Sequence, residues 1–436
     1  MKRFHSILFV LAVLLIVIET GCCNRARLEQ VTIVSRHGVR VPLEKYMADL
    51  DNIISEESTW PTWPVEGGHL SLRGSVLEYM AGEYYRNYFK DNGLRLTPGA
   101  VYFCASPKQR TVETSRAFAA GLFPGQKIAV EFRGSREFNY PDPEFLPLLN
   151  MQASLGTFDT LAFQAEARRE MDAIADSFDI SEDLRFLEEV IGLSGSRFAA
   201  ATHKKHFDED LKGFDIFFTK NGAPREPAFR STSDFNVANR ASDALILQYY
   251  EQDDSVLGNE AGNPRLKDLS IEDWKRLARI KDVYGEILFT APIVAVNVSH
   301  DMLGKVRGLL ASGGKKLNFL CTHDSMMDAL LTALQATHEP LPNTIEARTP
   351  IGFKIVLEKW KDKGRHYIRP YLAYYSTEQL RAGNPADLQG PPVKVMLSFK
   401  GLTLASNGMY RFEDFMQHLN GTYDAFDFTA KGQQPF

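Results

Sequence analysis

The stretch that most constrains the fold is residues 31–42, which reads Val-Thr-Ile-Val-Ser-Arg-His-Gly-Val-Arg-Val-Pro. Its first half, residues 31–35, is largely apolar and rich in β-branched side chains, which predicts a buried strand. The strand leads directly into Arg36, His37 and Arg40. In an open α/β sheet, ligands bind in the crevice beyond the carboxyl ends of the strands. The stretch therefore predicts an α/β fold with a histidine between two arginines at its binding edge.

The residue types at this strand end indicate phosphate chemistry. Arg36 and Arg40 would repel each other unless an anion joins them, and arginine binds phosphate through paired N–H donors. Gly38 allows backbone N–H groups to approach an oxyanion closely. A neutral imidazole at His37 can attack phosphorus, because neighbouring cations lower its pKa and keep it unprotonated. The alternative is a strand that ends in a solvated Arg-His-Gly turn, and the motif alone leaves both open.

A second motif lies almost the whole chain away from the first. Residues 317–322 form a mostly apolar run that ends on His323 and Asp324. An Arg-His-Gly-x-Arg-x-Pro sequence followed by a distant His-Asp pair resembles the signature of the histidine acid phosphatases, a branch of the phosphoglycerate mutase-like superfamily. The two motifs together are far more specific than either one.

A third segment, residues 101–114, reads as strand, turn and helix and contains Arg110. If its strand is parallel to that of His37, both residues lie at the same edge of the sheet. Alone, Arg110 would more often be a surface residue at a helix N-terminus. The sequence Gln-Arg-Thr-x-x-Thr from residue 109 to residue 114 resembles the family segment that carries the third phosphate-binding arginine, so the resemblance assigns that role to Arg110.

The resemblance implies a two-step hydrolysis of phosphomonoesters. His37 attacks phosphorus, Asp324 protonates the leaving alcohol, and water then cleaves the phosphohistidine. Four side chains are expected to bind the phosphate oxygens: Arg36, Arg40, Arg110 and His323. Arginines take the role that metal ions have elsewhere, so no metal and no other cofactor is expected. Acid pH should favour the reaction, because Asp324 must carry a proton while His37 stays neutral, and the pH profile should be bell-shaped.

The helical pattern predicts how the chain divides. Residues 137–292 are charge-rich and have helical periodicity at 163–176, 181–193, 233–251 and 270–288. We therefore expect a mostly α-helical cap domain at 137–292, inserted into a catalytic core made of residues 24–136 and 293–436. The core is expected to be a three-layer α/β unit with a mostly parallel sheet.

Three local elements of the core are also predicted. Residues 47–69 are polar and rich in proline and glycine, which predicts a loop. Ser71 caps an amphipathic helix that runs to about residue 89. Residues 352–375 alternate around a Lys-Gly turn, which predicts a β-hairpin at the edge of the sheet.

The substrate signals are mixed. Residues 247–251 resemble the glucose-1-phosphatase version of this segment, in which the glutamate matching Glu251 faces the substrate pocket and repels highly phosphorylated inositols. The alternative is a surface residue at the end of a helix. Gly38 is the residue that phytases have, whereas Glu44 stands where phytases tend to keep a lysine at the pocket rim. We expect sugar phosphates such as glucose-1-phosphate, with phytate or a broad range of phosphomonoesters as alternatives.

Two other classes share parts of this pattern. A phosphoglycerate mutase would have the same core, but it would ordinarily be cytosolic and its motif lacks Pro42. A non-catalytic sugar-phosphate binding protein could use the same arginines, but it would need neither His37 nor Asp324. The retention of both residues favours a hydrolase.

The N-terminus indicates export. Lys2 and Arg3 precede an apolar run at residues 7–18, which is too short to span a bilayer comfortably and is typical of a signal peptide ending near residue 22. Cys22 follows a glycine, so a lipid anchor at Cys22 and a plain signal peptide both stay open. The expected location is periplasmic or secreted. The net charge of −5 gives no indication of nucleic acid binding, and no protein partner is indicated.

Two further features are expected to carry no chemistry. Cys104 and Cys321 lie in apolar runs and are predicted to be unpaired core thiols, although a disulfide is possible if their strands are neighbours. His203 and His206 have a spacing that could hold a metal, but no third ligand type clusters nearby, so a solvated basic loop is favoured.

Overall fold

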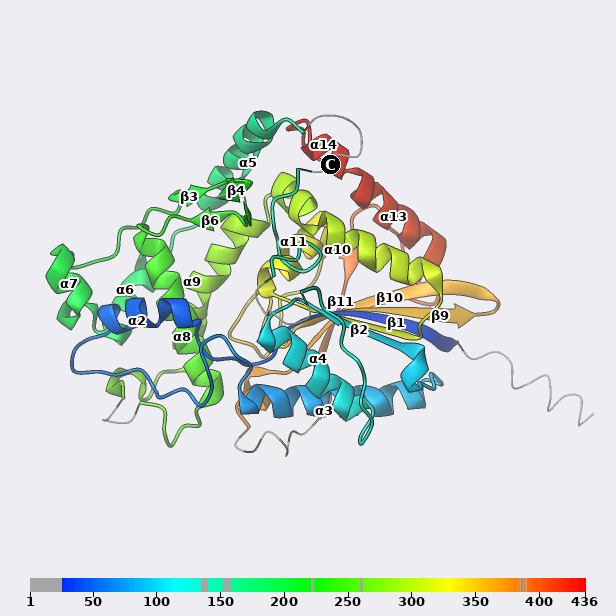
Figure 1. The fold of residues 1–436 in the computed structure, drawn as a ribbon, viewed down its shortest axis with the longest axis horizontal. Coiled ribbons are helices and arrows are strands. Elements are labelled where there is room, and N and C mark those ends of the chain that lie inside the picture. The colour runs from blue at the N-terminus through cyan, green and yellow to red at the C-terminus, as the bar shows by residue number, and fades with distance from the viewer. Residues whose placement is uncertain are drawn as a thin grey trace, which may run out of the picture.

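The computed structural model describes residues 26–134, 140–151, 158–220, 223–258, 262–382 and 390–436, with residues 384, 386 and 388. The predicted signal peptide, Cys22 and the start of the predicted cap at 137–139 lie outside the described residues. The central feature is a seven-stranded sheet in the order β11–β10–β9–β1–β7–β2, with β13 paired to β10 (Figure 1).

The strands that carry the motifs are parallel and adjacent: β1 (Arg27–Arg36), β7 (Leu317–Thr322) and β2 (Val101–Ala105). Leu317 of β7 pairs with Val31 of β1 on one side and with Val101 of β2 on the other. With this register the three strands end at the same edge, so the residues that follow each of them are brought together. The two motifs, which are far apart in the chain, therefore meet.

The other half of the sheet is antiparallel and contains β9 (Lys354–Asp362), β10 (Arg365–Tyr374), β11 (Val393–Met396) and β13 (Tyr410–Arg411). The predicted hairpin is present, and Lys363 and Gly364 form its turn with φ angles of 48° and 80°. The sequence predicts a mostly parallel sheet, but the observed sheet is mixed, because strands joined by so tight a turn must be antiparallel. β11, rather than the hairpin itself, forms the edge.

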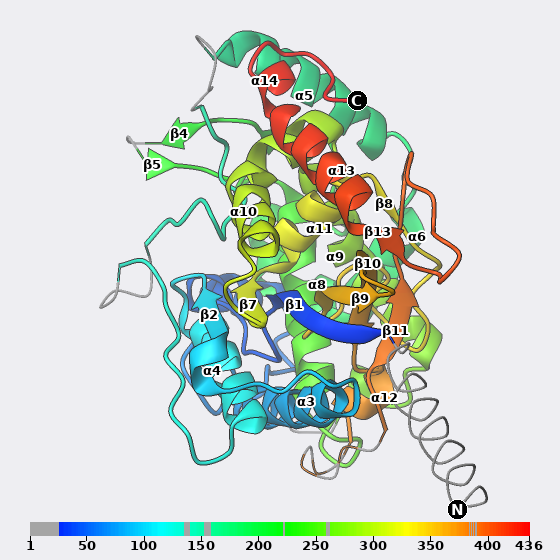
Figure 2. The ribbon, with the colours of Figure 1, turned by 90° about the vertical axis from the view of Figure 1, so that its right-hand side faces the viewer.

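Helices cover both faces of the sheet and make the predicted three-layer α/β core (Figure 2). Neighbouring residues of β7 point to opposite faces: Phe319 stacks on Phe118 of α4 with ring centroids 4.4 Å apart, and Leu320 belongs to the apolar cluster on the other face. The helices of the first face are α3 (Leu72–Asp91) and α4 (Gln109–Leu122). Those of the second face are α10 (Pro292–Ser312), α11 (Asp324–Ala333) and α13 (Phe412–Asp424), followed by α14 (Phe426–Thr429).

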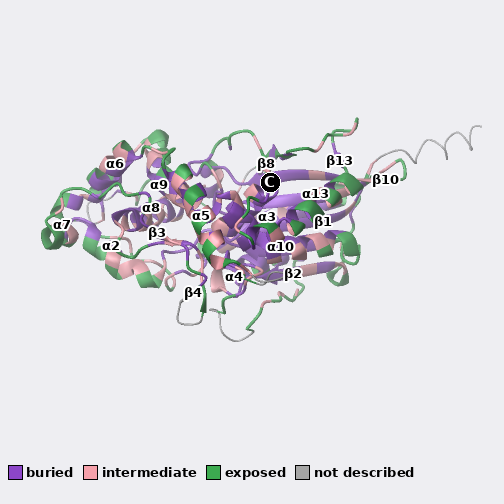
Figure 3. Cartoon of the chain, turned by 90° about the horizontal axis from the view of Figure 1, so that it is seen from above, coloured by how far each residue is buried: buried purple, intermediate pink, exposed green. Residues whose placement is uncertain are grey.

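The helices between residues 160 and 289 lie beyond the end of the sheet at which the motifs meet (Figure 1). They are α5 (Thr160–Ala175), α6 (Ser181–Ile191), α7 (Arg197–Thr202), α8 (Asp234–Glu251) and α9 (Ile271–Phe289). Four of them confirm the predicted helices, and short strands lie between α7 and α8: β3 (Phe214–Asp215), β4 (Thr219–Lys220), β5 (Ala223–Pro224) and β6 (Ala228–Phe229). Buried residues line α8 as well as the sheet, so these helices have an interior of their own (Figure 3).

The prediction of a loop at 47–69 is wrong for its first part, where η1 (Glu44–Tyr46) leads into α2 (Met47–Ile53). Leu50 and Ile53 are three residues apart and both buried, which gives this short helix an apolar side. The indole of Trp60 donates a hydrogen bond to the carbonyl of Leu50 at 3.0 Å. The polar residues between these apolar ones hid the pattern.

Cys104 and Cys321 are both buried and free, as predicted. They lie on neighbouring strands, but Cys104 pairs with Leu320 and Cys321 pairs with Ala105. The two thiols therefore point to opposite faces of the sheet, because side chains alternate along a strand.

The remaining elements are short: η2 (Pro98–Ala100), η3 (Leu193–Gly195), η4 (Pro264–Leu266), β8 (Ala336–Thr337), α12 (Thr377–Leu380) and β12 (Ser398–Phe399). In the part of the chain that the structure describes, no single helix is long and apolar enough to cross a membrane. Among the described helices, the pair α9 and α10, which meet at an angle of 84°, has the length and composition for it.

Candidate active site

His37 lies directly after β1 and is almost completely buried. Its Nδ1 lies 2.9 Å from the carbonyl oxygen of Gly38, and its backbone N–H donates to the carbonyl of Thr322 at 3.1 Å. The N–H of Gly38 donates to Oγ1 of Thr114 at 3.0 Å. A Cβ on Gly38 would lie 3.1 Å from Cγ of Glu78, which is tighter than ordinary contact. The glycine therefore allows the chain to pass close to α3 and fixes the position of the imidazole.

His323 and Arg110 reach the same place from the neighbouring strands. His323 is the N-cap residue of α11, and its ring centroid lies 5.5 Å from that of His37. Its Nδ1 lies 3.2 Å from a terminal nitrogen of Arg110, and its Nε2 lies 3.0 Å from Oγ of Ser106. The structure therefore brings His37, His323 and Arg110 together, as the sequence predicts.

The two histidines are neutral in this environment. Burial lowers the pKa of His37 well below its ordinary value, and the charges of Arg110 and Arg36 lower it further. Burial and the charge of Arg110 likewise hold the pKa of His323 well below its ordinary value. A neutral imidazole keeps the nitrogen lone pair that a nucleophile requires, even in acid solution.

Three guanidinium groups surround the imidazoles. Arg36 and Arg40 are buried, and burial together with the charge of Arg40 lowers the pKa of Arg110 to about 9, so it stays charged at acid pH. Arg40 forms an ion pair with Asp243 of α8 at 2.9 Å. Among the described residues, none supplies a hydrogen-bond partner for the buried Nε atoms of these three arginines.

Asp324, at the start of α11, is held by two cations. Its Oδ2 lies 3.2 Å from a terminal nitrogen of Arg36 and 3.2 Å from Nζ of Lys281. Burial alone would raise the pKa of Asp324, but Arg36 and Lys281 lower it by more, and it lies well below its ordinary value. Arg36 and Lys281 therefore favour the ionised form of Asp324, and its role as proton donor stays a prediction.

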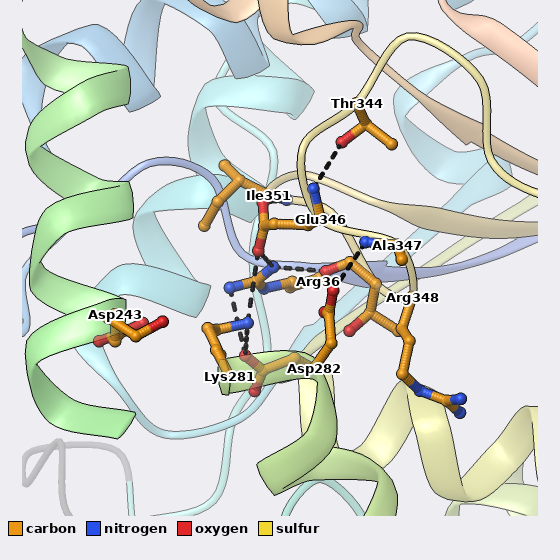
Figure 4. Close-up of polar contacts among 12 residues, drawn as sticks. Arg36, Asp243, Lys281, Asp282, Thr344, Glu346, Ala347, Arg348 and Ile351 are labelled. Carbon is orange, nitrogen blue, oxygen red and sulfur yellow. Dashed lines mark hydrogen bonds and ion pairs between the residues drawn. The ribbon is translucent and has the colours of Figure 1, made fainter. Parts of the chain in front are cut away.

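Glu346 completes a buried network of charges (Figure 4). It is fully buried, and its Oε1 lies 2.8 Å from Arg36 and 3.3 Å from Lys281. Its Oε2 accepts hydrogen bonds from the hydroxyl of Tyr250 at 3.1 Å and from the N–H of Ile351 at 2.9 Å. Arg36 also donates to the carbonyl of Thr349. These contacts fix the position of the Arg36 guanidinium group.

Sequence reasoning missed several residues of this site. Asp243 and Lys281 come from α8 and α9, and Glu346 comes from the loop before β9. Glu226, between β5 and β6, interacts electrostatically with Asp324 and Arg110: burial raises its pKa to about 7 although Lys45 and Lys108 act against this. One signal was available for Lys281, which occupies the inner stripe of an amphipathic helix where an apolar residue is expected.

The two residues predicted to set substrate specificity lie apart from the three arginines. Glu44 is exposed in η1 and packs against Gly67. Glu251, at the end of α8, is hydrogen-bonded to the side chain of Ser71 and lies near Arg73, and burial raises its pKa. Neither carboxylate is in contact with the arginines around His37.

No group of three or more metal-ligating side chains gathers anywhere in the described ranges. Of the two histidines with metal-like spacing, His206 lies with its Nδ1 2.8 Å from Glu188. His203 is exposed and ends α7 in the left-handed conformation, with φ of 57°.

A buried neutral histidine among three arginines, with a second histidine and an aspartate at the next strand end, defines the site of a histidine phosphatase. Residues 27–164 match the family model of the histidine phosphatase superfamily, branch 2. The chain is 30% identical over 406 residues to the glucose-1-phosphatase of Providencia rettgeri, covering 89% of this chain and 90% of that protein. It is 31% identical over 406 residues to the glucose-1-phosphatase of Salmonella typhimurium, covering 90% and 92%. The chain belongs to branch 2 of the histidine phosphatase superfamily and is a histidine acid phosphatase.

Phytases are also similar. The phytase AppA of Escherichia coli is 27% identical over 421 residues, covering 90% of this chain and 91% of that protein. The structure of the Citrobacter braakii phytase superimposes with a TM-score of 0.75 and 24% identity, covering 91% of this chain and 97% of the other. The likeness to that structure supports the fold alone.

Proposed function

We propose that this protein hydrolyses phosphomonoesters through a phosphohistidine on His37, with Asp324 as the proton donor to the leaving alcohol. Arg36, Arg40, Arg110 and His323 bind the phosphate oxygens and neutralise the charge that develops in the transition state. The observation that carries the proposal is the buried imidazole of His37 in one cluster with His323 and three guanidinium groups, whose Nε atoms have no hydrogen-bond partner among the described residues.

The proton for the leaving group arrives with the substrate. The second pKa of a phosphomonoester is about 6, so at acid pH the substrate carries one proton on its phosphate. When it binds beside Asp324, its negative charge offsets the charges of Arg36 and Lys281 and raises the pKa of the carboxyl group. The proton can then pass to Asp324 and from there to the leaving oxygen. Acid pH favours the reaction because the substrate, rather than the resting enzyme, holds this proton.

The second step uses the ionised form of the same carboxyl group. After the alcohol leaves, Asp324 is again an anion beside Arg36, and it can accept a proton from the water that attacks the phosphohistidine. The strong ion pairs of Asp324 therefore favour this step, and the substrate's proton makes the first step possible.

The proposed substrate class is a sugar phosphate such as glucose-1-phosphate. The support is the similarity to two glucose-1-phosphatases at 30% and 31% identity, compared with 27% for a phytase. The alternative is phytate or a broad range of phosphomonoesters. Glu251 was expected to disfavour phytate, but its contact with Ser71 gives the carboxylate a second role at the start of α3.

We also propose that residues 137–292 act as a cap over a core of residues 24–136 and 293–436. The support is that α8 and α9 supply Asp243 and Lys281 to a site built on the sheet. Export to the periplasm or outside the cell, through the signal at residues 1–22 with or without a lipid on Cys22, is part of the same proposal and rests on the sequence.

The test is phosphate release at about pH 4.5 in EDTA from glucose-1-phosphate and from phytate, for the wild type and His37→Ala. The matched control is His338→Ala, because His338 lies near the surface, with its Nδ1 2.7 Å from the carbonyl oxygen of Glu339. We expect release by the wild type and the control and none by His37→Ala, with a higher rate on glucose-1-phosphate. Release that survives in His37→Ala, or that EDTA abolishes, would disprove the phosphohistidine mechanism.

The non-catalytic alternative is a sugar-phosphate binding protein. The experiment that separates it is a binding measurement with inorganic phosphate on the wild type, combined with the hydrolysis assay. A pure binding protein would bind phosphate and release none from either ester.

A further inference from the structure

Lys281 belongs to the helical region but contacts residues of the sheet-bearing part of the chain. It lies on α9, and only 12% of its side chain is exposed. Its Nζ is 3.2 Å from Oδ2 of Asp324. It is also 3.3 Å from Oε1 of Glu346 (Figure 4). Both partners belong to the sheet-bearing part of the chain, one at the start of α11 and one in the loop before β9. One ammonium group therefore bridges two separate segments of the site.

Lys281 lies on the buried stripe of α9, where an apolar residue is expected. Trp274 and Leu277 precede it and Leu288 follows it on the buried stripe of the helix. A lysine on such a stripe loses its hydration, which costs free energy unless anionic partners compensate for it. Asp324 and Glu346 are those partners, and they keep the pKa of Lys281 above its ordinary value in spite of burial and the nearby charge of Arg36.

Other residues of α9 contact the loop that contains Glu346. Asp282 accepts a hydrogen bond from the N–H of Ala347 at 2.8 Å (Figure 4). Glu286 forms an ion pair with Arg348 at 2.9 Å. Arg348 also pairs with Asp328 of α11 at 3.0 Å. Three consecutive loop residues and the helix that begins with Asp324 are thus fixed to α9. The ammonium group of Lys281 has a defined place relative to Asp324.

We propose that Lys281 is a positioning residue of the phosphatase reaction, which holds the Asp324 carboxylate against Arg36 in the geometry for proton transfer. This inference rests on the proposed function. The ammonium group acts through Asp324 and does not bind the substrate phosphate. It sets the balance between the two steps, because the first step needs the proton on Asp324 and the second needs the free carboxylate.

The pH dependence of both steps tests this role. Several charged or titratable groups act on Asp324: Arg36, His37 and Arg40 at the end of β1, Arg110 of α4, Lys281 and Tyr284 of α9, Glu226 between β5 and β6, and Asp328 of α11. Lys281 is one of the two cations in direct contact with its Oδ2. Because an opposite charge at this distance lowers a carboxyl pKa by about one to three units, removing it should raise the pKa of Asp324 by a similar amount.

The experiment compares Lys281→Met, Lys281→Arg and Lys275→Met with the wild type. Methionine has a similar length without the charge, arginine keeps the charge, and Lys275 is an exposed lysine on the same helix that pairs with Glu272. The first step is measured as alcohol release in a single turnover with enzyme in excess, and the second as decay of the phosphoenzyme. Both rates are recorded from about pH 3 to pH 8, with glucose-1-phosphate and with p-nitrophenyl phosphate.

In Lys281→Met, we expect the acid limb of the second step to move up by one pH unit or more, because the free carboxylate of Asp324 then forms only at higher pH. The first step should become faster at acid pH, because the substrate's proton passes more readily to Asp324, while its alkaline limb stays with the phosphate of the substrate. The gain in the rate of the first step should be much smaller with p-nitrophenyl phosphate, because its phenolate leaves with little protonation. Lys281→Arg should restore the wild-type limbs, and Lys275→Met should match the wild type throughout.

Two results would overturn the inference while the proposed function stands. Rates that fall in Lys281→Met without any movement of the limbs would show a merely structural role. A weaker affinity for inorganic phosphate with unmoved limbs would show that Lys281 binds the phosphate itself. If Lys281→Met does not fold, Lys281→Gln provides the same test with a smaller polar side chain. Absence of hydrolysis by the wild type would instead disprove the proposed function.

Discussion

The substitution Glu346→Gln removes one charge from the buried network that joins Glu346 to Arg36 and Lys281. The carboxylate of Glu346 receives four interactions, from Arg36, Lys281, Tyr250 and Ile351. A glutamine has the same shape, but its amide has only one accepting oxygen, and its NH₂ group would face a donor. Removing one partner of a buried ion pair leaves the other charge uncompensated, which costs about 3–5 kcal/mol.

The expected loss can be expressed as a change in melting temperature. Unfolding entropy is about 2.1 cal/mol/K per residue, or roughly 0.9 kcal/mol/K for a chain of this length. A loss of about 3–5 kcal/mol therefore lowers Tm by about 3–6 °C at pH 6. The assay is differential scanning calorimetry of the wild type, Glu346→Gln and the control Glu339→Gln, whose carboxylate is exposed on a neighbouring loop.

The pH dependence of this loss has a defined sign. Burial raises the pKa of Glu346, but Arg36 and Lys281 lower it by more, so the folded pKa lies below the ordinary value. The stabilisation is therefore fully present above the unfolded pKa of about 4.3 and is lost as pH falls through the folded pKa. We expect the difference in Tm between wild type and variant to be largest at pH 5–7 and to shrink below pH 4. A change under 1 °C at pH 6, or a difference that does not depend on pH, would refute the reasoning.

Three further predictions concern separate parts of the structure. Arg110→Ala should lower kcat/KM by about 10²–10³-fold with little change in Tm, because it removes charge from the phosphate-binding face; an unchanged kcat/KM in steady-state assays would exclude a contact with phosphate. Gly121→Ala should lower the free energy of unfolding, measured by urea denaturation, by about 1–3 kcal/mol, because a Cβ there would overlap a backbone carbonyl of α3. The control is Gly308→Ala on α10, where a Cβ meets nothing within 4 Å, and it should be neutral or stabilising. Cys104 and Cys321 are buried and free, so dithiothreitol should leave Tm unchanged. Both thiols should react with iodoacetamide only after unfolding, and reaction of either one in the native protein would contradict this.

The parts of the site that the sequence predicts are those that lie beside a strong local pattern. Residues 31–35 and 317–322 are recognisable strands, so His37 and His323 are placed at the same edge once both strands are parallel. Arg110 follows in the same way, because its strand and helix have clear periodicity. In each case the chemistry sits at the end of an element whose type can be read from a few consecutive residues.

The residues that the sequence does not predict reach the site across the fold. Asp243 and Lys281 lie in the middle of helices, and their contacts with Arg40 and Asp324 depend on how α8 and α9 pack against the end of the sheet. No local pattern encodes that packing. The prediction for Glu251 depended on the same information, and the structure places its carboxylate beside Ser71. Charged residues on the buried stripe of an amphipathic helix are the local sign that such contacts exist.

The charges of the site explain how it stays folded without substrate and still binds an anion. Seven buried or half-buried groups are in contact with one another or with the histidines: the cations Arg36, Arg40, Arg110 and Lys281, and the carboxylates Asp243, Asp324 and Glu346. Four positive and three negative charges leave one positive charge, which a phosphomonoester monoanion balances. A second negative charge on the phosphate would exceed this balance and would favour protonation of the nearest carboxyl group, which is the one that must carry a proton to the leaving alcohol. The carboxylates that stabilise the resting site therefore also determine where the proton goes during the reaction.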